Sequence, residues 1–105
     1  RQDQTDVGDG NIHYFLIGQN KPQRQMCILR EIMPPGSDTG KEMLSHEGEE
    51  GGVVMQGEVE LTVGDKVRVL GPGDAYYFES KIPHRFRNIG KQDVILVSAN
   101  TPATF

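Results

Sequence analysis

The sequence predicts a small all-β domain, built as a sandwich or a barrel. Thirteen glycines and six prolines divide the 105 residues into short segments, many of which alternate between apolar and polar residues as half-buried strands do. No stretch sustains an apolar repeat of 3.6 residues, so we expect little helix. A chain of this length fits one domain with one modest core.

Eight segments have the length and alternation expected of strands. The second is followed by Pro34-Pro35-Gly36, where a ladder of backbone hydrogen bonds cannot continue. Gly71-Pro72-Gly73-Asp74 predicts a tight turn, because proline fixes φ and glycine accepts a positive φ. In chain order, the predicted strands are Ile12–Ile17, Gln25–Met33, Val53–Met55, Glu58–Val63, Lys66–Leu70, Ala75–Phe78, His84–Asn88 and Val94–Ala99.

The fourth and fifth predicted strands are close enough in sequence to form a hairpin, and their pattern predicts its register. A two-residue turn would place Arg68 opposite Leu61, which puts a charge on the apolar face. A three-residue loop, Gly64–Lys66, places Val69 opposite Leu61 instead. Because a slip of one residue turns every side chain over, the apolar pattern favours the longer loop. This register also brings Glu60 near Arg68 on the solvent face.

Charge and composition exclude several classes of protein. The formal net charge of −4 and a pI near 5.3 argue against direct binding of nucleic acid by this domain. One cysteine, Cys27, cannot form an internal disulfide, which suits a reducing, cytoplasmic setting. No apolar run approaches the ~20 residues of a membrane helix, and no signal-peptide pattern opens the given sequence. Because the sequence starts at Arg1 and not at methionine, we expect it to be part of a longer chain.

Two histidines and a carboxylate form a candidate metal site. His84 begins a predicted strand, while His46 and Glu50 are separated by an even spacing that places both on one face of an extended segment. Two neutral nitrogen donors and one anionic oxygen suit iron, manganese, nickel or zinc without choosing among them. The alternative is a polar cluster in which both imidazoles hydrogen-bond Glu50 around water.

These residues resemble the first of the two short motifs of the cupin superfamily, whose members are small jelly-roll β-barrels. The motif has a His-x-His pair, then a glutamate, then a glycine after six intervening residues. Glu50 and Gly57 keep this last spacing, and His46 occupies the second histidine position. Leu44 occupies the first, which is a departure that removes one expected ligand.

The second cupin motif is similar to the region around His84. Gly73, His84 and Asn88 match the glycine, histidine and asparagine of that motif, whereas its Pro-x-Gly is replaced by Glu79-Ser80-Lys81, with Pro83 directly before the histidine. The resemblance covers about Ile28 to Ala99. It implies a double-stranded β-helix, or jelly-roll barrel, with the three donors converging inside.

Four further segments resemble a narrower group, the carboxy-terminal cupin domains of XRE-type helix-turn-helix regulators, including putrescine-utilisation repressors. This resemblance implies one cupin domain over residues 1–105, a DNA-reading segment before Arg1, a homodimer, and a small effector in the barrel. DNA would be contacted only through the missing amino-terminal part, and no membrane is involved. The four segments are Pro34–Gly40, Ser45–Gly51, Gly73–Phe78 and Ile82–Phe86.

Acidic and aromatic residues near the two motifs could hold a cationic amine by charge and by ring-face attraction. Strand alternation limits this arrangement, because Tyr77 must face away from its two aromatic neighbours. The alternative is that the glutamates are solvated and the aromatic rings fill the barrel. The candidate ligand-binding residues are Glu47, Glu49, Met55, Tyr76, Phe78 and Phe86.

Three functions remain open from the sequence. The favoured one is a domain that senses a polyamine or an amino-acid-related effector for a DNA-binding transcriptional regulator, with a divalent metal in the barrel. The main rival is a free-standing metal-dependent enzyme, a dioxygenase or an isomerase. A dimerisation domain with a vestigial pocket is the third. The ligand lost at Leu44 argues against catalysis, and no catalytic residue is assigned.

Overall fold

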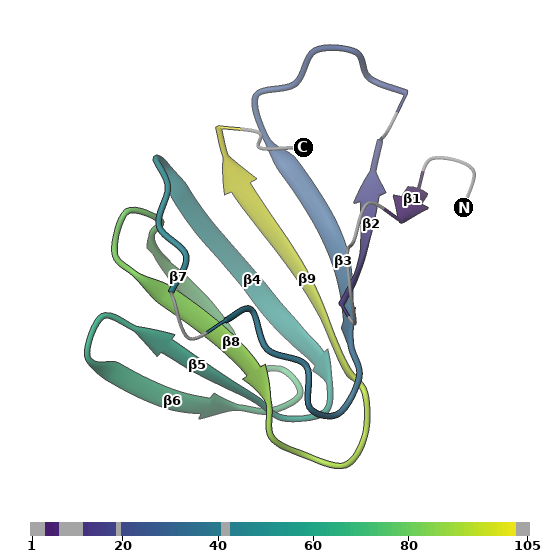
Figure 1. The fold of residues 1–105 in the computed structure, drawn as a ribbon. Coiled ribbons are helices and arrows are strands. Elements are labelled where there is room, and N and C mark those ends of the chain that lie inside the picture. Colours follow the sequence, from purple (N-terminus) through teal and green to yellow (C-terminus); the bar gives the residue numbers. More distant parts are fainter. Residues whose placement is uncertain (1–3, 7–11, 19, 41–42, 103–105) are drawn as a thin grey trace.

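In a computed structural model of the chain, the described residues are 4–6, 12–18, 20–40 and 43–102. They form nine strands and no helix, which confirms the all-β prediction (Figure 1). Among them, no helix is long and apolar enough to cross a membrane. The strands are β1 (Gln4–Asp6), β2 (His13–Ile17), β3 (Cys27–Met33), β4 (Glu49–Gln56), β5 (Val59–Val63), β6 (Lys66–Leu70), β7 (Ala75–Glu79), β8 (His84–Asn88) and β9 (Val94–Thr101).

The strands pair in two antiparallel sheets. The larger has the order β1-β2-β3-β9-β4-β7, and the smaller has the order β6-β5-β8. Figure 1 shows the two sheets as two layers, with the smaller sheet across the left side of the larger. This two-layer antiparallel arrangement is the jelly-roll type of barrel that the sequence predicts.

The inner face of the larger sheet changes from apolar to polar along its strands. At one end Met33 pairs with Val94, and both are buried in the apolar core. Towards the other end the inward positions of β3 and β9 carry Glu31, Ser98 and Asn100, which are also buried. The same alternation therefore closes one end of the barrel with hydrocarbon and lines the other with polar groups.

The strand β4 is longer than the predicted segment Val53–Met55, because it begins at Glu49. Gly51 and Gly52 hide this extension, since glycine is disfavoured in strands. In the structure both glycines lie under tyrosine rings of β7. A Cβ atom at Gly52 would lie 2.6 Å from the Val97 carbonyl oxygen and closer still to the Tyr76 hydroxyl. These glycines therefore make room for aromatic side chains on the neighbouring strand.

The predicted three-residue hairpin loop is wrong. In the structure Arg68 lies opposite Leu61, and the turn is the two-residue Gly64-Asp65, with Gly64 at a φ of 62°. The prediction assumed that the valines of the second strand face the core. However, β6 is an edge strand, and Val67 and Val69 are 50% and 53% exposed. Arg68 is exposed as well, so no charge is buried in the observed register.

The change of register also changes the partner of Glu60. Glu60 forms an ion pair with Arg87 of β8, at 2.8 Å, and not the predicted contact with Arg68. The neighbouring outward arginine of β8, Arg85, binds the carboxylate of Asp38 through two nitrogens. Both arginines therefore lie on the solvent side of β8, with the buried His84, Phe86 and Asn88 on the inner side.

Candidate functional site

The structure brings His46, Glu50 and His84 together at the polar end of the barrel. One donor atom from each lies within 4.8 Å of the others. Nε2 of His84 is 3.8 Å from Oε1 of Glu50, and Nε2 of His46 is 4.0 Å from the same oxygen. Glu50 comes from the larger sheet and His84 from the smaller one, so this cluster, the triad, joins the two layers.

Backbone pairing on both sides holds His84 in position. It lies opposite Val63 of β5, and it exchanges two backbone hydrogen bonds with Leu44, of 2.8 and 2.9 Å. Leu44, which replaces the first histidine of the first cupin motif, therefore still holds His84 of the second motif in place through its main chain. The His84 side chain is 1% exposed and packs against the ring of Phe78, with ring centroids 4.8 Å apart.

Backbone carbonyl groups fix the protonation pattern of both imidazoles. Nδ1 of His84 lies 2.8 Å from the Ile82 carbonyl oxygen, and Nδ1 of His46 lies 3.2 Å from that of Glu47. Since a carbonyl oxygen only accepts, each neutral ring must carry its proton on Nδ1. Each Nε2 lone pair then faces Glu50. Nε2 of His84 is buried and has no hydrogen-bond partner among the described residues.

Burial makes the triad a poor place for uncompensated charge. It raises the pKa of Glu50 to about 7, an effect that nearby His46 partly opposes. It also lowers the pKa of His84, which therefore favours the neutral ring. Two imidazole lone pairs and a carboxylate facing one another are the donor set and the orientation that a divalent metal needs. The residues present therefore fit a metal ion.

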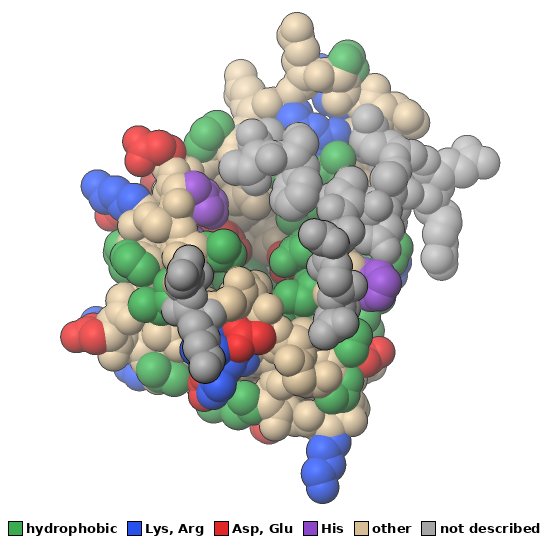
Figure 2. Space-filling view, in the orientation of Figure 1, with side chains coloured by type: hydrophobic (Ala, Val, Ile, Leu, Met, Phe, Trp, Pro, Cys, Tyr) green, Lys and Arg blue, Asp and Glu red, His purple; other side chains and the backbone are tan. Residues whose placement is uncertain are grey.

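A cavity of about 170 Å³ opens beside the triad, and both sheets contribute to its walls. Figure 2 shows the molecule hollowed near its centre, with acidic atoms inside and a histidine at the edge. None of the described residues that line the cavity is a lysine or an arginine. Its lining includes Tyr14, Glu31, His46, Glu50, Phe86 and Ser98.

Of the predicted aromatic ligand-binding residues, only Phe86 lines this cavity. Tyr76 and Phe78 also point into the barrel, but they pack within or against the apolar core. The Tyr76 ring lies 5.3 Å from that of Phe86 and 5.9 Å from that of Phe78. Tyr77 faces the opposite side of β7 and is 73% exposed, as the strand alternation predicts.

The other three predicted ligand-binding residues lie outside the cavity. Met55 is 58% exposed near the end of β4. Glu47 and Glu49 are exposed, and the Glu49 carboxylate accepts a hydrogen bond from the hydroxyl of Tyr77 on the outer surface. Their side chains do not reach the polar interior because Glu49, next to the inward Glu50, points to the other face of the strand.

Five polar residues of the cavity wall are absent from the predicted set, namely Tyr14, Glu31, Thr39, Ser98 and Asn100. Glu31 is 8% exposed, and the Ser98 hydroxyl donates to its carboxylate. Burial raises the pKa of Glu31 to about 7, the Ser98 hydrogen bond opposes this rise, and Glu50 adds to it. The alternation of Cys27, Leu29, Glu31 and Met33 would have placed this carboxylate on the core face.

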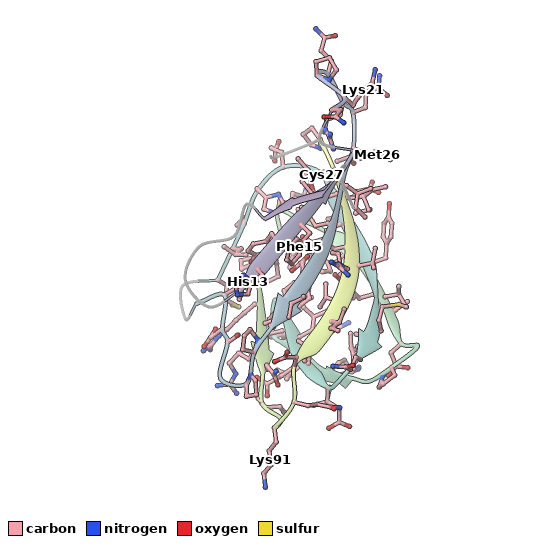
Figure 3. All side chains as sticks on the ribbon, turned by 90° about the vertical axis from the view of Figure 1, so that its right-hand side faces the viewer. His13, Phe15, Lys21, Met26, Cys27 and Lys91 are labelled. Atoms are coloured by element: carbon pink, nitrogen blue, oxygen red, sulfur yellow. The ribbon has the colours of Figure 1, made fainter. Side chains whose placement is uncertain are left out.

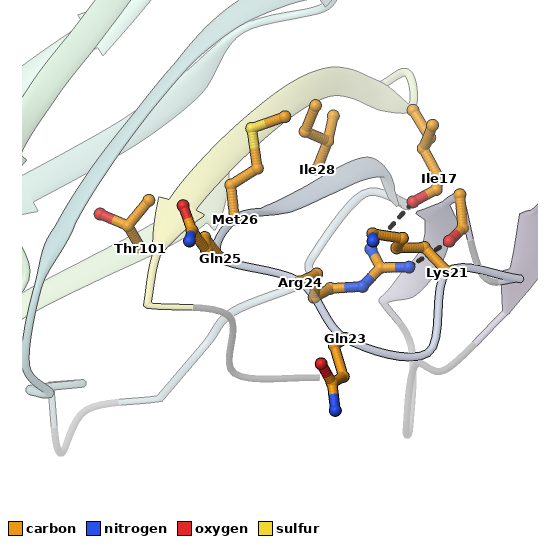
Figure 4. A pocket seen from close by; sticks show the side chains of 9 residues that line it. Ile17, Lys21, Gln23, Arg24, Gln25, Met26, Ile28 and Thr101 are labelled. Carbon is orange, nitrogen blue, oxygen red and sulfur yellow. Dashed lines mark hydrogen bonds between the residues drawn. The ribbon is translucent and has the colours of Figure 1, made fainter.

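A larger cavity of about 840 Å³ lies outside the barrel, between the β2–β3 connection and the end of β9 (Figure 4). Apolar side chains such as Met26 and Ile28 line it together with Arg24. The Arg24 guanidinium is engaged, since it donates to the carbonyl oxygens of Ile17 and Gly18. Among the described residues that line this cavity there is no acidic, histidine or cysteine residue, so the barrel interior is the better candidate site.

Comparison with known sequences gives one family and one kind of relative. Residues 29–100 match the family described as Cupin_2, cupin domain. The chain is 33% identical over all 105 residues to the HTH-type transcriptional regulator PuuR of Escherichia coli K12. It covers 56% of that regulator, so the chain spans about half the length of the curated relatives it matches.

Solved structures share the fold with both regulators and enzymes. The Cupin_2 domain of an XRE family transcriptional regulator from Enterobacter cloacae superposes with a TM-score of 0.76 at 23% identity, covering 88% of this chain and 97% of that one. Ectoine synthase from P. lautus superposes with a TM-score of 0.78 at 16% identity, covering 98% and 71%. Identities this low relate the folds alone.

The buried Glu31 carboxyl predicts how stability depends on pH. Its pKa is about 7 in the folded chain against an ordinary 4.5, so the folded chain keeps a proton that the unfolded chain releases within that window. Stability therefore falls as pH rises from about 4.5 to about 7 and levels off above it. Glu31→Gln cannot ionise, so the variant should be about 3 kcal/mol more stable than wild type at pH 8 and nearly equal to it at pH 4.5.

Urea denaturation at the two pH values, in the presence of EDTA, measures this difference. Glu58→Gln, at an exposed glutamate, is the matched control and should follow the wild-type profile. Identical profiles for Glu31→Gln and wild type would contradict the prediction.

Proposed function

Since the chain belongs to the cupin family, we propose that it senses a small molecule on behalf of a DNA-binding transcriptional regulator. The observation that carries this proposal is the convergence of three oriented donors beside a cavity that His46 and Glu50 line together with further polar residues. Similarity along the whole chain to a regulator of this kind supports it. On this reading the domain works in the cytoplasm, where such a regulator reaches DNA.

A divalent metal at the triad is the first part of the proposal. His46 and His84 would each supply Nε2 and Glu50 a carboxylate oxygen. The carbonyl groups that hold both Nδ1 atoms would keep the rings oriented for this role. Bound there, iron, manganese, nickel or zinc would polarise an oxygen or nitrogen atom of the ligand.

The size of the cavity limits the effector. A cavity of about 150 Å³ holds a molecule of the size of benzene, and the one beside the triad measures about 170 Å³. An effector of about six non-hydrogen atoms is therefore expected, which fits a small polyamine or an amino-acid-related compound.

With a formal charge of −4, this domain is not expected to contact DNA itself. That contact would belong to a helix-turn-helix segment elsewhere in the parent protein.

A homodimer is the second part of the proposal, and the outer face of the larger sheet supports it. The outward positions of β3, β4 and β9 include Ile32, Ile95, Val97 and Val53, which are only half-buried in the isolated chain. A contiguous apolar face of this kind is typical of a contact surface. Effector binding would then favour one arrangement of the dimer, and a coupling of about 1–3 kcal/mol suffices to change operator occupancy.

A metal-dependent enzyme remains the second candidate, and Glu31 is the observation that favours it. A buried carboxyl group with a raised pKa beside a metal site has the properties of a general acid or base. The same fold also occurs in enzymes such as ectoine synthase.

The reading frame before Arg1 is a test that distinguishes the regulator from the enzyme. A helix-turn-helix pattern there favours the regulator, whereas turnover of a candidate substrate by the metal-loaded chain favours the enzyme.

Removing one imidazole tests the metal site. After dialysis against EDTA, wild type should bind about one equivalent of Zn²⁺ or Ni²⁺, and His84→Ala should bind it at least tenfold more weakly, a loss of about 1.4 kcal/mol or more. His13→Ala is the matched control, because His13 is exposed on β2 (Figure 3) and is not part of the described donor group. Elemental analysis and calorimetry give the metal content and the affinity. Equal metal content in wild type and His84→Ala would eliminate the triad as a metal site.

A charge on the outer face of the larger sheet tests the dimer. Ile95→Asp should convert a dimer to a monomer, because Ile95 lies opposite Ile32 and Gln56, and an unpaired carboxylate at a buried contact is costly. Val69→Asp, at an exposed valine of the smaller sheet, should leave the dimer intact. Light scattering after size-exclusion chromatography measures the mass of each variant. A monomeric wild type, or a dimeric and folded Ile95→Asp, would argue against this interface.

A further inference from the structure

A row of polar positions crosses the inner face of the larger sheet, at the depth where the apolar core ends. Tyr14 of β2 lies opposite Glu31 of β3, and the Ser98 hydroxyl of β9 donates to the Glu31 carboxylate. Gly52 of β4 pairs with Ser98 on one side and with Tyr76 of β7 on the other. Because paired residues project to the same face, these positions on five strands form one continuous row.

Gly52 allows the hydroxyl group of Tyr76 to lie close to Ser98 in this row. Without a side chain at Gly52, the Tyr76 ring lies across β4 towards Ser98. Burial and the nearby Glu31 and Glu50 raise the pKa of Tyr76, and a hydrogen bond with Ser98 partly opposes this rise. The Tyr76 hydroxyl therefore stays protonated and extends the polar row next to Ser98.

Among the described residues of the cavity wall, the Glu31 carboxylate has no cationic partner. Glu31 is 8% exposed, and none of those described residues is a lysine or an arginine. Arg30, the next residue along β3, projects to the outer face, where its guanidinium lies 5.0 Å from the centre of the Phe15 ring. A buried carboxylate with no counter-charge is costly, and a positively charged ligand removes that cost.

We propose that Glu31, with Ser98 and Tyr14 beside it, is a subsite for the primary ammonium group of a small aliphatic amine. The subsite shares the cavity with His46 and Glu50 of the triad but uses none of the triad's donors. The three N–H bonds of an ammonium group match one carboxylate and two hydroxyl oxygens. Phe86, which lines the same cavity, offers an aromatic surface to the alkyl chain. The inference rests on the proposed function, because both assume that the effector binds in this cavity.

Two probes of equal size and different charge test the subsite. Calorimetric titration of the EDTA-treated chain should show that n-butylamine binds, whereas 1-butanol binds at least tenfold more weakly. Glu31→Gln keeps the volume and removes the charge, so it should weaken n-butylamine binding tenfold or more. Ser98→Ala should weaken it several-fold. Glu58→Gln, at an exposed glutamate, should bind n-butylamine within twofold of wild type. The thermal midpoint of each variant without ligand confirms that it is folded.

Three outcomes overturn the subsite: no binding of n-butylamine to wild type, equal binding of n-butylamine and 1-butanol, or unchanged amine affinity in folded Glu31→Gln. The metal titration of His84→Ala reports separately on the proposed function. If metal binding depends on His84 while Glu31→Gln keeps full amine affinity, the amine subsite fails and the proposed function stands. If wild type binds neither metal nor any small probe, both fail.

Discussion

The structure depends on one constraint, which is the convergence of two imidazole lone pairs and a carboxylate in a buried place. Backbone carbonyl groups of Ile82 and Glu47 hold the Nδ1 protons, so both Nε2 atoms must face Glu50. Without a proton or a cation between them, the two imidazole lone pairs and the Glu50 carboxylate repel one another. Burial of the carboxylate costs several kcal/mol as well. A proton relieves part of this cost, and a metal ion relieves more of it. The geometry is therefore the one that the proposed metal site requires.

The barrel supplies this site by changing the character of its inner face along continuous strands. Hydrocarbon from Met33, Val94 and Leu96 closes one end, and the same strands carry Glu31, Ser98 and Asn100 farther along. The core stabilises the sheets, which then hold polar groups that could not pack by themselves. Because Glu50 and His84 belong to different sheets, a ligand at the triad also bridges the two layers. This bridging could connect ligand binding to the arrangement of a dimer.

The sequence predicted the fold and the triad well, because both depend on strong local signals. Alternation and turn residues located eight of the strands, and the short motifs located the three donors. It failed where a side chain's environment is set by distant strands. The valines of β6 implied a buried face on an edge strand that has none. Glu47 and Glu49 suggested an acidic pocket by composition, whereas the buried acid outside the triad is Glu31, whose place on the core face follows from the alternation along β3.

The proposed metal and the proposed amine would bind to different side chains near one cavity. A regulator could therefore hold the metal ion permanently and respond to changes in the concentration of the amine.

The most direct test of the central claim is X-ray absorption at the zinc edge, on the chain loaded with one equivalent of Zn²⁺. The geometry predicts two imidazole nitrogens and further oxygen donors at about 2.0–2.1 Å. A spectrum with an oxygen-only shell and no imidazole scattering would contradict the convergence of the triad on a metal.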